Sequence, residues 1–120
     1  MPGRLKDKTA IVIGAARGLG AGIAELFAEE GAKVVIADGL AAEGRATAER
    51  LASIGETMFA EMDVARRTDN EALVAATLKR FGRIDILVQN AGIYPMTMIA
   101  DIQESEWDRV LAVNLKGVFL

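Results

Sequence analysis

The chain has 120 residues, neither cysteine nor histidine, and a formal net charge of −3 with an isoelectric point near 5.0. Without those two residue types the sequence excludes disulfides, sulfur-based metal sites and the usual general base, so we expect no metal site. The near-balanced charge and the lack of a bilayer-spanning apolar run predict no nucleic-acid or membrane partner, and the charged N-terminus favours the cytoplasm.

Apolar strands alternate with helices along the sequence. The strands are expected at residues 9–13, 33–38, 57–62 and 84–88. The helices are expected from a glycine-rich turn to Gly31, over 40–54, from Thr68 to Gly82, and from about Gln103 onward. Nearly continuous apolar strands are typical of parallel sheets covered on both faces, and the helices between them form βαβ units. The pattern predicts an α/β fold with a doubly wound parallel sheet.

Apolar side chains at helical spacing predict which helix faces turn inward. The predicted inward residues are Ile23, Leu26 and Phe27; Leu73, Val74, Leu78 and Phe81; and Trp107, Val110, Leu111, Asn114 and Val118. Thr68 and Glu71 have the spacing of a capping box at the start of their helix. A buried amide needs a hydrogen-bond partner, so Asn114 ties its helix to a neighbouring loop, has a function, or does both.

Three glycines follow the first strand with the spacing Gly14-x-x-x-Gly18-x-Gly20. Glycine permits a sharp turn and a close approach, and the helix that follows would direct free N–H groups at an anion. The turn is therefore either a phosphate cradle or an ordinary glycine-rich turn, and the spacing alone does not decide between them.

A carboxylate, Asp38, ends the second strand 18 residues after Gly20. An acidic residue at this place in a dinucleotide-binding βαβ unit accepts hydrogen bonds from the adenosine ribose. It would repel the 2′-phosphate of NADP, whereas Arg17 in the turn would attract it. Because Asp38 would lie directly against the ribose while Arg17 can turn into solvent, NAD is favoured over NADP. The alternative is a loop aspartate that only solvates the strand end.

The last residues, 117–120, carry no helix-ending signal. The fourth strand would also be an unprotected apolar edge. We therefore expect the chain to be part of a longer protein, with a sheet that is incomplete on its C-terminal side. A natural minimal domain, or one completed by a partner chain, is the alternative.

Five motifs occur in the order and spacing of one family: the glycine turn, Asp38, Asp63-Val64, Asn90-Ala91-Gly92 and Val113-Asn114-Leu115-x-Gly117. On these motifs the chain, from about Lys6 to Leu120, resembles the short-chain dehydrogenase/reductase family. The resemblance implies that residues 1–120 form an NAD(P)-binding Rossmann-type domain with strand order 3-2-1-4. It also implies hydride transfer between the nicotinamide and an alcohol or ketone.

The resemblance implies a role for each motif residue. The pyrophosphate would rest on Gly14, Gly18, Gly20 and the Leu19 amide, with Arg17 near the adenosine phosphate. Asp38 would bind the adenosine ribose, Asp63 would bind the adenine amino group, and Val64 would lie beside the ring. The nicotinamide-side ribose would pass along Asn90, Ala91 and Gly92. Asn114 matches the catalytic asparagine, which binds a water in a proton relay.

The chain departs from the family pattern in two ways. Ile13 and Gln89 stand where threonine and asparagine are common, and we expect these two positions to share a local contact. The catalytic serine and Tyr-x-x-x-Lys do not follow Asn114, and Tyr94 has no lysine four residues later. The 120 residues alone are therefore expected to be inactive.

These observations predict the cofactor half of an NAD-dependent oxidoreductase that acts on a small alcohol or carbonyl substrate. One alternative is a non-catalytic dinucleotide-binding module. Another is a Rossmann-type fold for a different adenosine cofactor, such as a methyltransferase, although the glycine spacing and Asn114 argue against it. The resemblance also implies a homo-dimer or homo-tetramer, packed through the helix that contains Asn114.

Overall fold

The computed structural model describes residues 3–120. Helices and strands alternate in the order β1 (Thr9–Ile13), α1 (Gly18–Glu29), β2 (Lys33–Asp38), α2 (Ala41–Leu51), β3 (Thr57–Glu61), α3 (Arg67–Phe81) and β4 (Ile86–Gln89). A 3₁₀ turn (Ile99–Asp101) then precedes α4 (Glu104–Leu111), a π-helical segment (Ala112–Lys116) and the short α5 (Gly117–Phe119).

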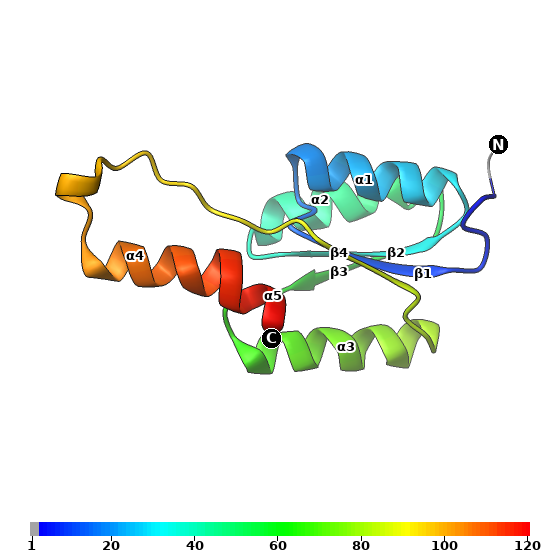
Figure 1. Ribbon diagram of the computed structural model, residues 1–120. Helices are drawn as coiled ribbons and strands as arrows, with labels where there is room; N and C mark the ends of the chain where they lie inside the picture. Colours follow the sequence, from blue (N-terminus) through cyan, green and yellow to red (C-terminus); the bar gives the residue numbers. More distant parts are fainter. Residues whose placement is uncertain (1–2) are drawn as a thin grey trace.

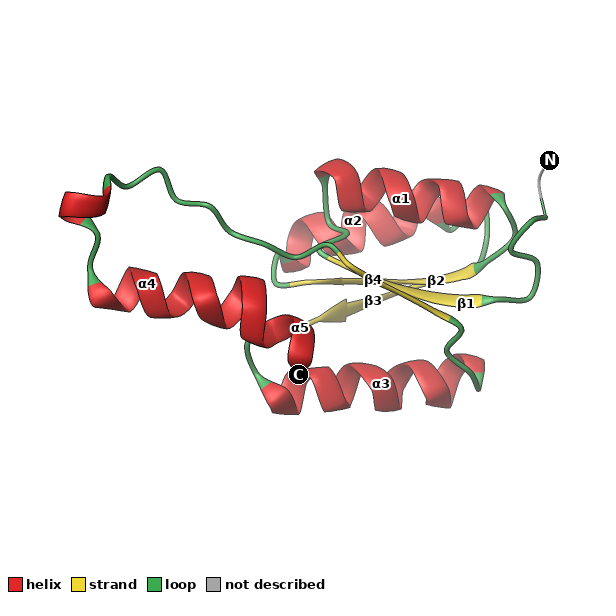
Figure 2. Ribbon diagram, viewed as in Figure 1, coloured by secondary structure: helices red, strands yellow, loops and turns green. Residues whose placement is uncertain are grey.

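The four strands form one parallel sheet in the order β3-β2-β1-β4. Helices α1 and α2 cover one face of the sheet and α3 covers the other (Figure 1; Figure 2). The loop after β4 leads away from the sheet, and α4 returns toward it (Figure 1). The predicted α/β fold, the doubly wound sheet and the strand order are confirmed, although α2 ends three residues earlier than expected.

The sheet is buried because each face packs against different helices. All five residues of β1 are buried. Val12 packs on one face with Leu51 of α2, and Ile11 packs on the other with Leu73 of α3 and Val113. This two-sided burial explains why the strands are nearly continuous apolar runs rather than alternating ones.

Helix α1 packs on the sheet through small side chains. Ala21, Ala24 and Ala28 are buried, whereas Leu26 is 48% exposed. The prediction that Leu26 turns inward was therefore wrong. Alanines let the helix approach the strands closely, and the larger residues Ile23 and Phe27 are only partly buried beside them.

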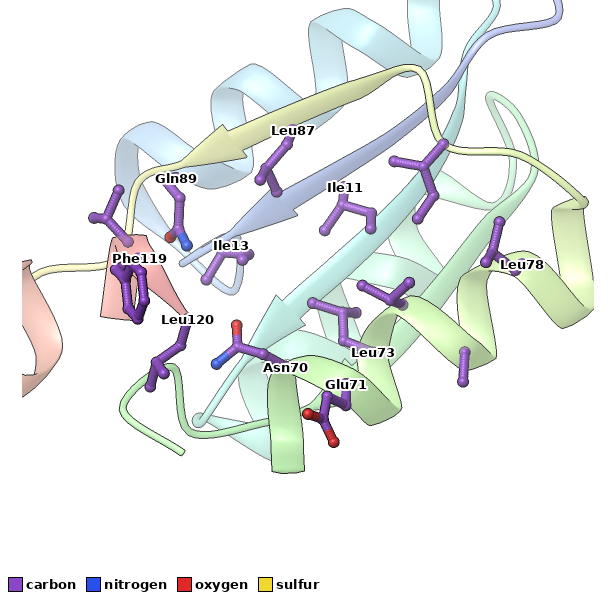
Figure 3. Close-up of a pocket in the computed structure, with 14 residues that line it drawn as sticks. Ile11, Ile13, Asn70, Glu71, Leu73, Leu78, Leu87, Gln89, Phe119 and Leu120 are labelled. Atoms are coloured by element: carbon purple, nitrogen blue, oxygen red, sulfur yellow. The ribbon is translucent and has the colours of Figure 1, made fainter. Parts of the chain in front are cut away.

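Several side chains predicted to turn inward on α3 and α4 are exposed. Val74 and Leu78 of α3 line an open apolar groove together with Leu87 of β4 (Figure 3). The groove lies beside β4, an edge strand of the sheet, where no further element within residues 3–120 covers these side chains. On the last helices, Trp107, Leu111 and Val118 are likewise exposed, and Val113 is buried instead.

The predicted capping box of Thr68 and Glu71 was also wrong. Helix α3 begins at Arg67 with Arg66 as its N-cap residue, so Thr68 already lies inside the first turn. The end of the helix is as expected, because Gly82 adopts the left-handed conformation that terminates helices, with φ of +79°.

Gly44 lies where α2 passes over Phe59 of β3. A Cβ added at Gly44 would overlap the Phe59 ring. Gly22 in α1 differs, because, apart from its chain neighbours and the nearby backbone of its own helix, no atom within residues 3–120 lies within 4 Å of the place its Cβ would take. The two helical glycines are therefore a matched pair, one in a crowded place and one in an open place.

We expect Gly44→Ala to lower the free energy of unfolding by about 1–3 kcal/mol, the usual cost of overpacking, even though alanine favours helix. Gly22→Ala should raise it by up to about 1 kcal/mol, because alanine has the higher helix propensity. Urea unfolding of both variants measures the difference. Equal stability of the two variants would contradict the packing seen at Phe59.

Candidate functional site

The glycine turn between β1 and α1 contains two kinds of glycine. Gly14 has φ of +83°, and a Cβ there would lie 2.9 Å from the amide nitrogen of Ala91. A Cβ at Gly20 would collide with the Gly14 carbonyl and lie 2.8 Å from Asn90 Nδ2. These two glycines allow close backbone packing. Gly18, with φ of +62°, has open space within the described structure where its Cβ would lie.

The open space at Gly18 lies at the start of α1. The N-cap residue, Arg17, makes no side-chain cap hydrogen bond within the described residues, and the first turn holds no acidic side chain. The first N–H groups of a helix lack partners inside the helix, and the positive end of the helix dipole adds to their attraction for an anion. Leu19, in this first turn, is 73% exposed. The turn therefore fits a phosphate group.

Asp38 ends β2 directly beside this turn. Its Oδ2 accepts the Ala16 N–H at 3.0 Å, and its Oδ1 accepts the Leu40 N–H at 3.0 Å. Each carboxylate oxygen can accept more than one hydrogen bond. Asp38 therefore holds the turn and keeps acceptor capacity for a hydroxyl group of a ligand.

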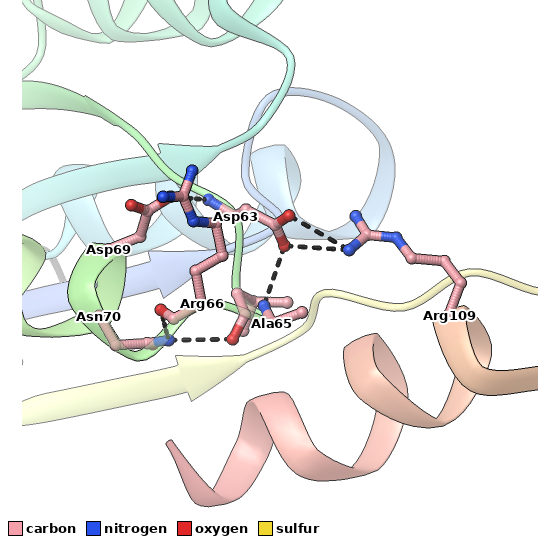
Figure 4. A network of polar contacts seen from close by, with 7 residues as sticks. Asp63, Ala65, Arg66, Asp69, Asn70 and Arg109 are labelled. Carbon is pink, nitrogen blue, oxygen red and sulfur yellow. Dashed lines mark hydrogen bonds and ion pairs between the residues drawn. The ribbon is translucent and has the colours of Figure 1, made fainter. Parts of the chain in front are cut away.

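Asp63 lies at the centre of a polar network beyond β3 (Figure 4). Its Oδ1 accepts the Ala65 N–H at 2.9 Å, its Oδ2 lies 3.1 Å from Arg109 Nη1, and its own N–H donates to Asp69 at 2.8 Å. Burial raises the pKa of the Asp63 carboxyl, but the Ala65 amide and the Arg109 guanidinium lower it more, so the net shift is downward. Asp63 is therefore held in its charged form.

Val64, the neighbour of Asp63, packs in the core. Its side chain is 6% exposed, and a Cβ at Gly117 would lie 3.0 Å from it. Gly117 thus lets the last helix approach the segment between β3 and α3. The Val64 side chain supports this helix instead of lining an open surface.

The segment after β4 closes the other side of the glycine turn. Asn90 donates from Nδ2 to the Gly14 carbonyl at 3.2 Å, and Ala91 lies against Gly14. The expected contact between positions 13 and 89 is confirmed, because Ile13 and Gln89 are register partners on β1 and β4. Gln89 donates to the Gly117 carbonyl at 3.2 Å, and its buried Oε1 has no partner within residues 3–120.

Asn114 lies in the π-helical segment, and such segments are frequent at functional sites. Its Oδ1 accepts the Ile93 N–H at 2.8 Å, and its Nδ2 donates to the Ile93 carbonyl at 2.6 Å. Of the alternatives for Asn114, a tie between its helix and a neighbouring loop is therefore present, and the loop lies just beyond Gly92. The prediction that Asn114 faces the core was wrong, because the residue is exposed.

Two residues of the site have no counterpart among the predictions. Thr47 of α2 donates to the Ala16 carbonyl in the glycine turn, and Arg109 of α4 pairs with Asp63. Both partners are distant in sequence, and neither residue stands in a recognisable motif.

Within residues 3–120, no helix is long and apolar enough to cross a membrane, and no group of three or more potential metal-ligating side chains gathers.

The sequence matches the short chain dehydrogenase family over residues 8–120. It is 42% identical to the trans-4-hydroxycyclohexanecarboxylate dehydrogenase of Sinomonas cyclohexanicum, covering 98% of this chain and 48% of that protein. It is 46% identical to the galactitol 2-dehydrogenase of Agrobacterium fabrum, covering 95% of this chain and 44% of that protein.

The fold matches a crystal structure of a short chain dehydrogenase from Mycobacterium smegmatis. The TM-score is 0.92 at 38% sequence identity, covering 98% of this chain and 50% of that chain. The chain therefore spans about half the length of the curated relatives it matches.

Arg109→Gln should raise the pKa of Asp63. Burial raises this pKa, and in the variant only the Ala65 amide and the positive charge of Arg66 would still lower it. A carboxyl whose pKa is lower in the folded than in the unfolded protein stabilises the fold at pH values above its unfolded pKa of about 4. This contribution is lost as the pH falls through the folded pKa. The stability difference between wild type and variant should therefore shrink below about pH 4.

An NMR titration of the Asp63 carboxyl carbon in the full-length protein measures this shift. Arg66→Gln is the control, since Arg66 acts on Asp63 through its charge without a side-chain hydrogen bond and has the smaller influence. Equal shifts in the two variants would contradict the role given to the Arg109 contact.

Proposed function

Because the chain belongs to the short-chain dehydrogenase/reductase family, we propose that it is the cofactor-binding part of an NAD(P)-dependent oxidoreductase. One observation carries the proposal. Gly18 combines a left-handed backbone with open space at the uncapped start of α1, and Asp38 is bonded to the same turn. An anion at the helix start and a ribose beside Asp38 fit this arrangement together.

The pyrophosphate would rest on the amides of Gly18 and Leu19, where Gly14 and Gly20 bring the backbone close. The adenosine ribose would bind Asp38, and Asp63 would accept a hydrogen bond from the adenine amino group. The nicotinamide-side ribose would lie along Asn90, Ala91 and Gly92.

NAD is favoured over NADP by the charges beside the turn. Asp38 has both oxygens fixed by backbone N–H groups, so its negative charge would stay close to a 2′-phosphate and repel it. Arg17, the cation that would attract this phosphate, lies 3.5 Å from Glu43 in an exposed pair. The attraction is therefore partly offset by a neighbouring carboxylate.

The bound dinucleotide would supply hydride transfer to or from a carbon of the substrate. Two relatives are named as dehydrogenases of hydroxylated compounds, which supports an alcohol or carbonyl substrate here. One N–H of the Asn114 amide and further acceptor capacity of its oxygen are free of the Ile93 contacts. These atoms suit a water of a proton relay, and the serine and Tyr-x-x-x-Lys would come from residues after Leu120.

We also propose a homo-dimer or homo-tetramer that packs through the helical stretch carrying Asn114. Leu111, Leu115 and Phe119 expose apolar side chains along this stretch. Contiguous exposed apolar surface commonly marks an interface, and burying these side chains against a second copy would remove them from water.

Calorimetric titration of the full-length protein with NADH and with NADPH tests the proposed cofactor. NADH should bind more tightly, by about tenfold or more, the effect of roughly 1.4 kcal/mol of charge repulsion. Asp38→Asn removes the charge and also one of the two oxygens that accept backbone N–H groups. It should therefore weaken NADH binding and narrow the ratio between the NADH and NADPH affinities. Tighter binding of NADPH by the wild type would overturn the role given to Asp38.

The same protein preparation separates the enzyme from a non-catalytic module. An enzyme should form NADH from NAD and a secondary alcohol, which absorbance follows directly. Binding without turnover on any alcohol, or full-length sequence without a serine and Tyr-x-x-x-Lys after Leu120, would favour the module. Absence of binding of both dinucleotides would overturn the proposal.

A further inference from the structure

Ala16 lies within the glycine turn, and its backbone is held from two sides. Its N–H donates to Asp38 Oδ2 at 3.0 Å, and its carbonyl accepts the Thr47 hydroxyl at 2.6 Å. Ala16 is 3% exposed and Thr47 is 7% exposed, so bulk water competes little for these bonds. One bond joins the turn to β2, and the other joins it to α2.

Thr47 uses its hydroxyl differently from the other buried helical threonine. A threonine inside a helix often donates to the carbonyl four residues earlier in the same helix. Thr77 of α3 does so, donating to the Leu73 carbonyl at 2.8 Å. Thr47 donates instead to a carbonyl 31 residues away in the chain. The single hydrogen of its hydroxyl is therefore donated to the turn and not to a carbonyl of α2.

The Thr47 bond fixes the peptide plane that leads into α1. A trans peptide is planar, so the Arg17 N–H points opposite to the Ala16 carbonyl. That carbonyl points toward the buried side of α2. The Arg17 N–H is therefore directed away from α2. Arg17 is itself exposed, and it immediately precedes Gly18, where the uncapped helix begins.

We propose that Thr47 is a positioning residue for dinucleotide binding, which orients the Ala16–Arg17 peptide so that the N–H groups at the start of α1 face the pyrophosphate before it arrives. Donors that are already ordered lose less conformational freedom on binding, and affinity rises accordingly. This inference rests on the proposed function, because it assigns a role toward the same ligand.

The test compares variants of the full-length protein. Thr47→Val removes the hydroxyl and keeps the side-chain shape, and Thr47→Ser keeps the hydroxyl. Thr77→Val is the matched control, since it removes another buried hydroxyl, one that bonds inside its own helix. Two quantities are measured: the Kd of ADP-ribose by calorimetry, and hydrogen exchange of the Ala16 amide without ligand. ADP-ribose contains the pyrophosphate and both riboses but no nicotinamide, so the affinity is read without turnover.

Thr47→Val should raise the Kd by about tenfold, because binding would then have to order the start of α1, at a cost of about 1.4 kcal/mol. Thr47→Ser and Thr77→Val should stay within about twofold of wild type. Exchange of the Ala16 amide should become faster in Thr47→Val and stay unchanged in Thr77→Val. If Thr47→Val does not fold, Thr47→Ala replaces it with the same expectations, because alanine favours helix.

Equal affinities of Thr47→Val and Thr77→Val would overturn the inference and leave the proposed function intact. Wild-type protein that binds no ADP-ribose would instead overturn the proposed function, and this inference with it. The two failures are therefore distinguished by the wild-type titration.

Discussion

The close backbone contact between the glycine turn and the segment after β4 is the constraint on which the rest of the site depends. A Cβ at Gly14 would press on the Ala91 backbone, and a Cβ at Gly20 would collide with the Gly14 carbonyl. A side chain at Gly14 would force the ends of β1 and β4 apart, although these strands are direct neighbours in the sheet, and one at Gly20 would push the start of α1 away from the end of β1. The same contact fixes where α1 starts. Of the three glycines of the turn, Gly14 and Gly20 therefore pack against backbone, whereas Gly18 borders open space.

Polar side chains around this contact stabilise loops and remain available to a ligand. Asp38, Asn90 and Asn114 each bond to the backbone of another segment or loop. Such bonds satisfy backbone groups that the sheet leaves unpaired at its edge. Because carboxylate and amide oxygens accept more than one hydrogen bond, holding a loop does not exclude binding a hydroxyl or a water. A structural role and a ligand role are thus compatible at these positions.

Sequence patterns predicted the sheet well and the helix faces less well, for a physical reason. β1 is apolar at nearly every position because both of its faces are covered, and this can be recognised without knowing the neighbours. Leu26 and Trp107 follow helical spacing, but whether such residues are buried depends on what packs beside them. Thr47 lay beyond prediction altogether, since its partner carbonyl is 31 residues away. Local patterns predict the elements, and tertiary contacts decide which side chains meet.

The last helical stretch contacts both ends of the candidate site. Arg109 reaches Asp63, the residue proposed to bind adenine, and Asn114 is bonded to Ile93, next to the segment proposed to lie along the nicotinamide-side ribose. These two residues are five apart, and in a regular α-helix of 3.6 residues per turn they would point in clearly different directions. Arg109 lies in α4 and Asn114 in the π-helical segment, which has wider turns with i→i+5 bonds, so the two contacts are made from different parts of one continuous helical stretch. A shift of this one helical stretch would therefore change the surroundings of Asp63 and of the loop at Ile93 together.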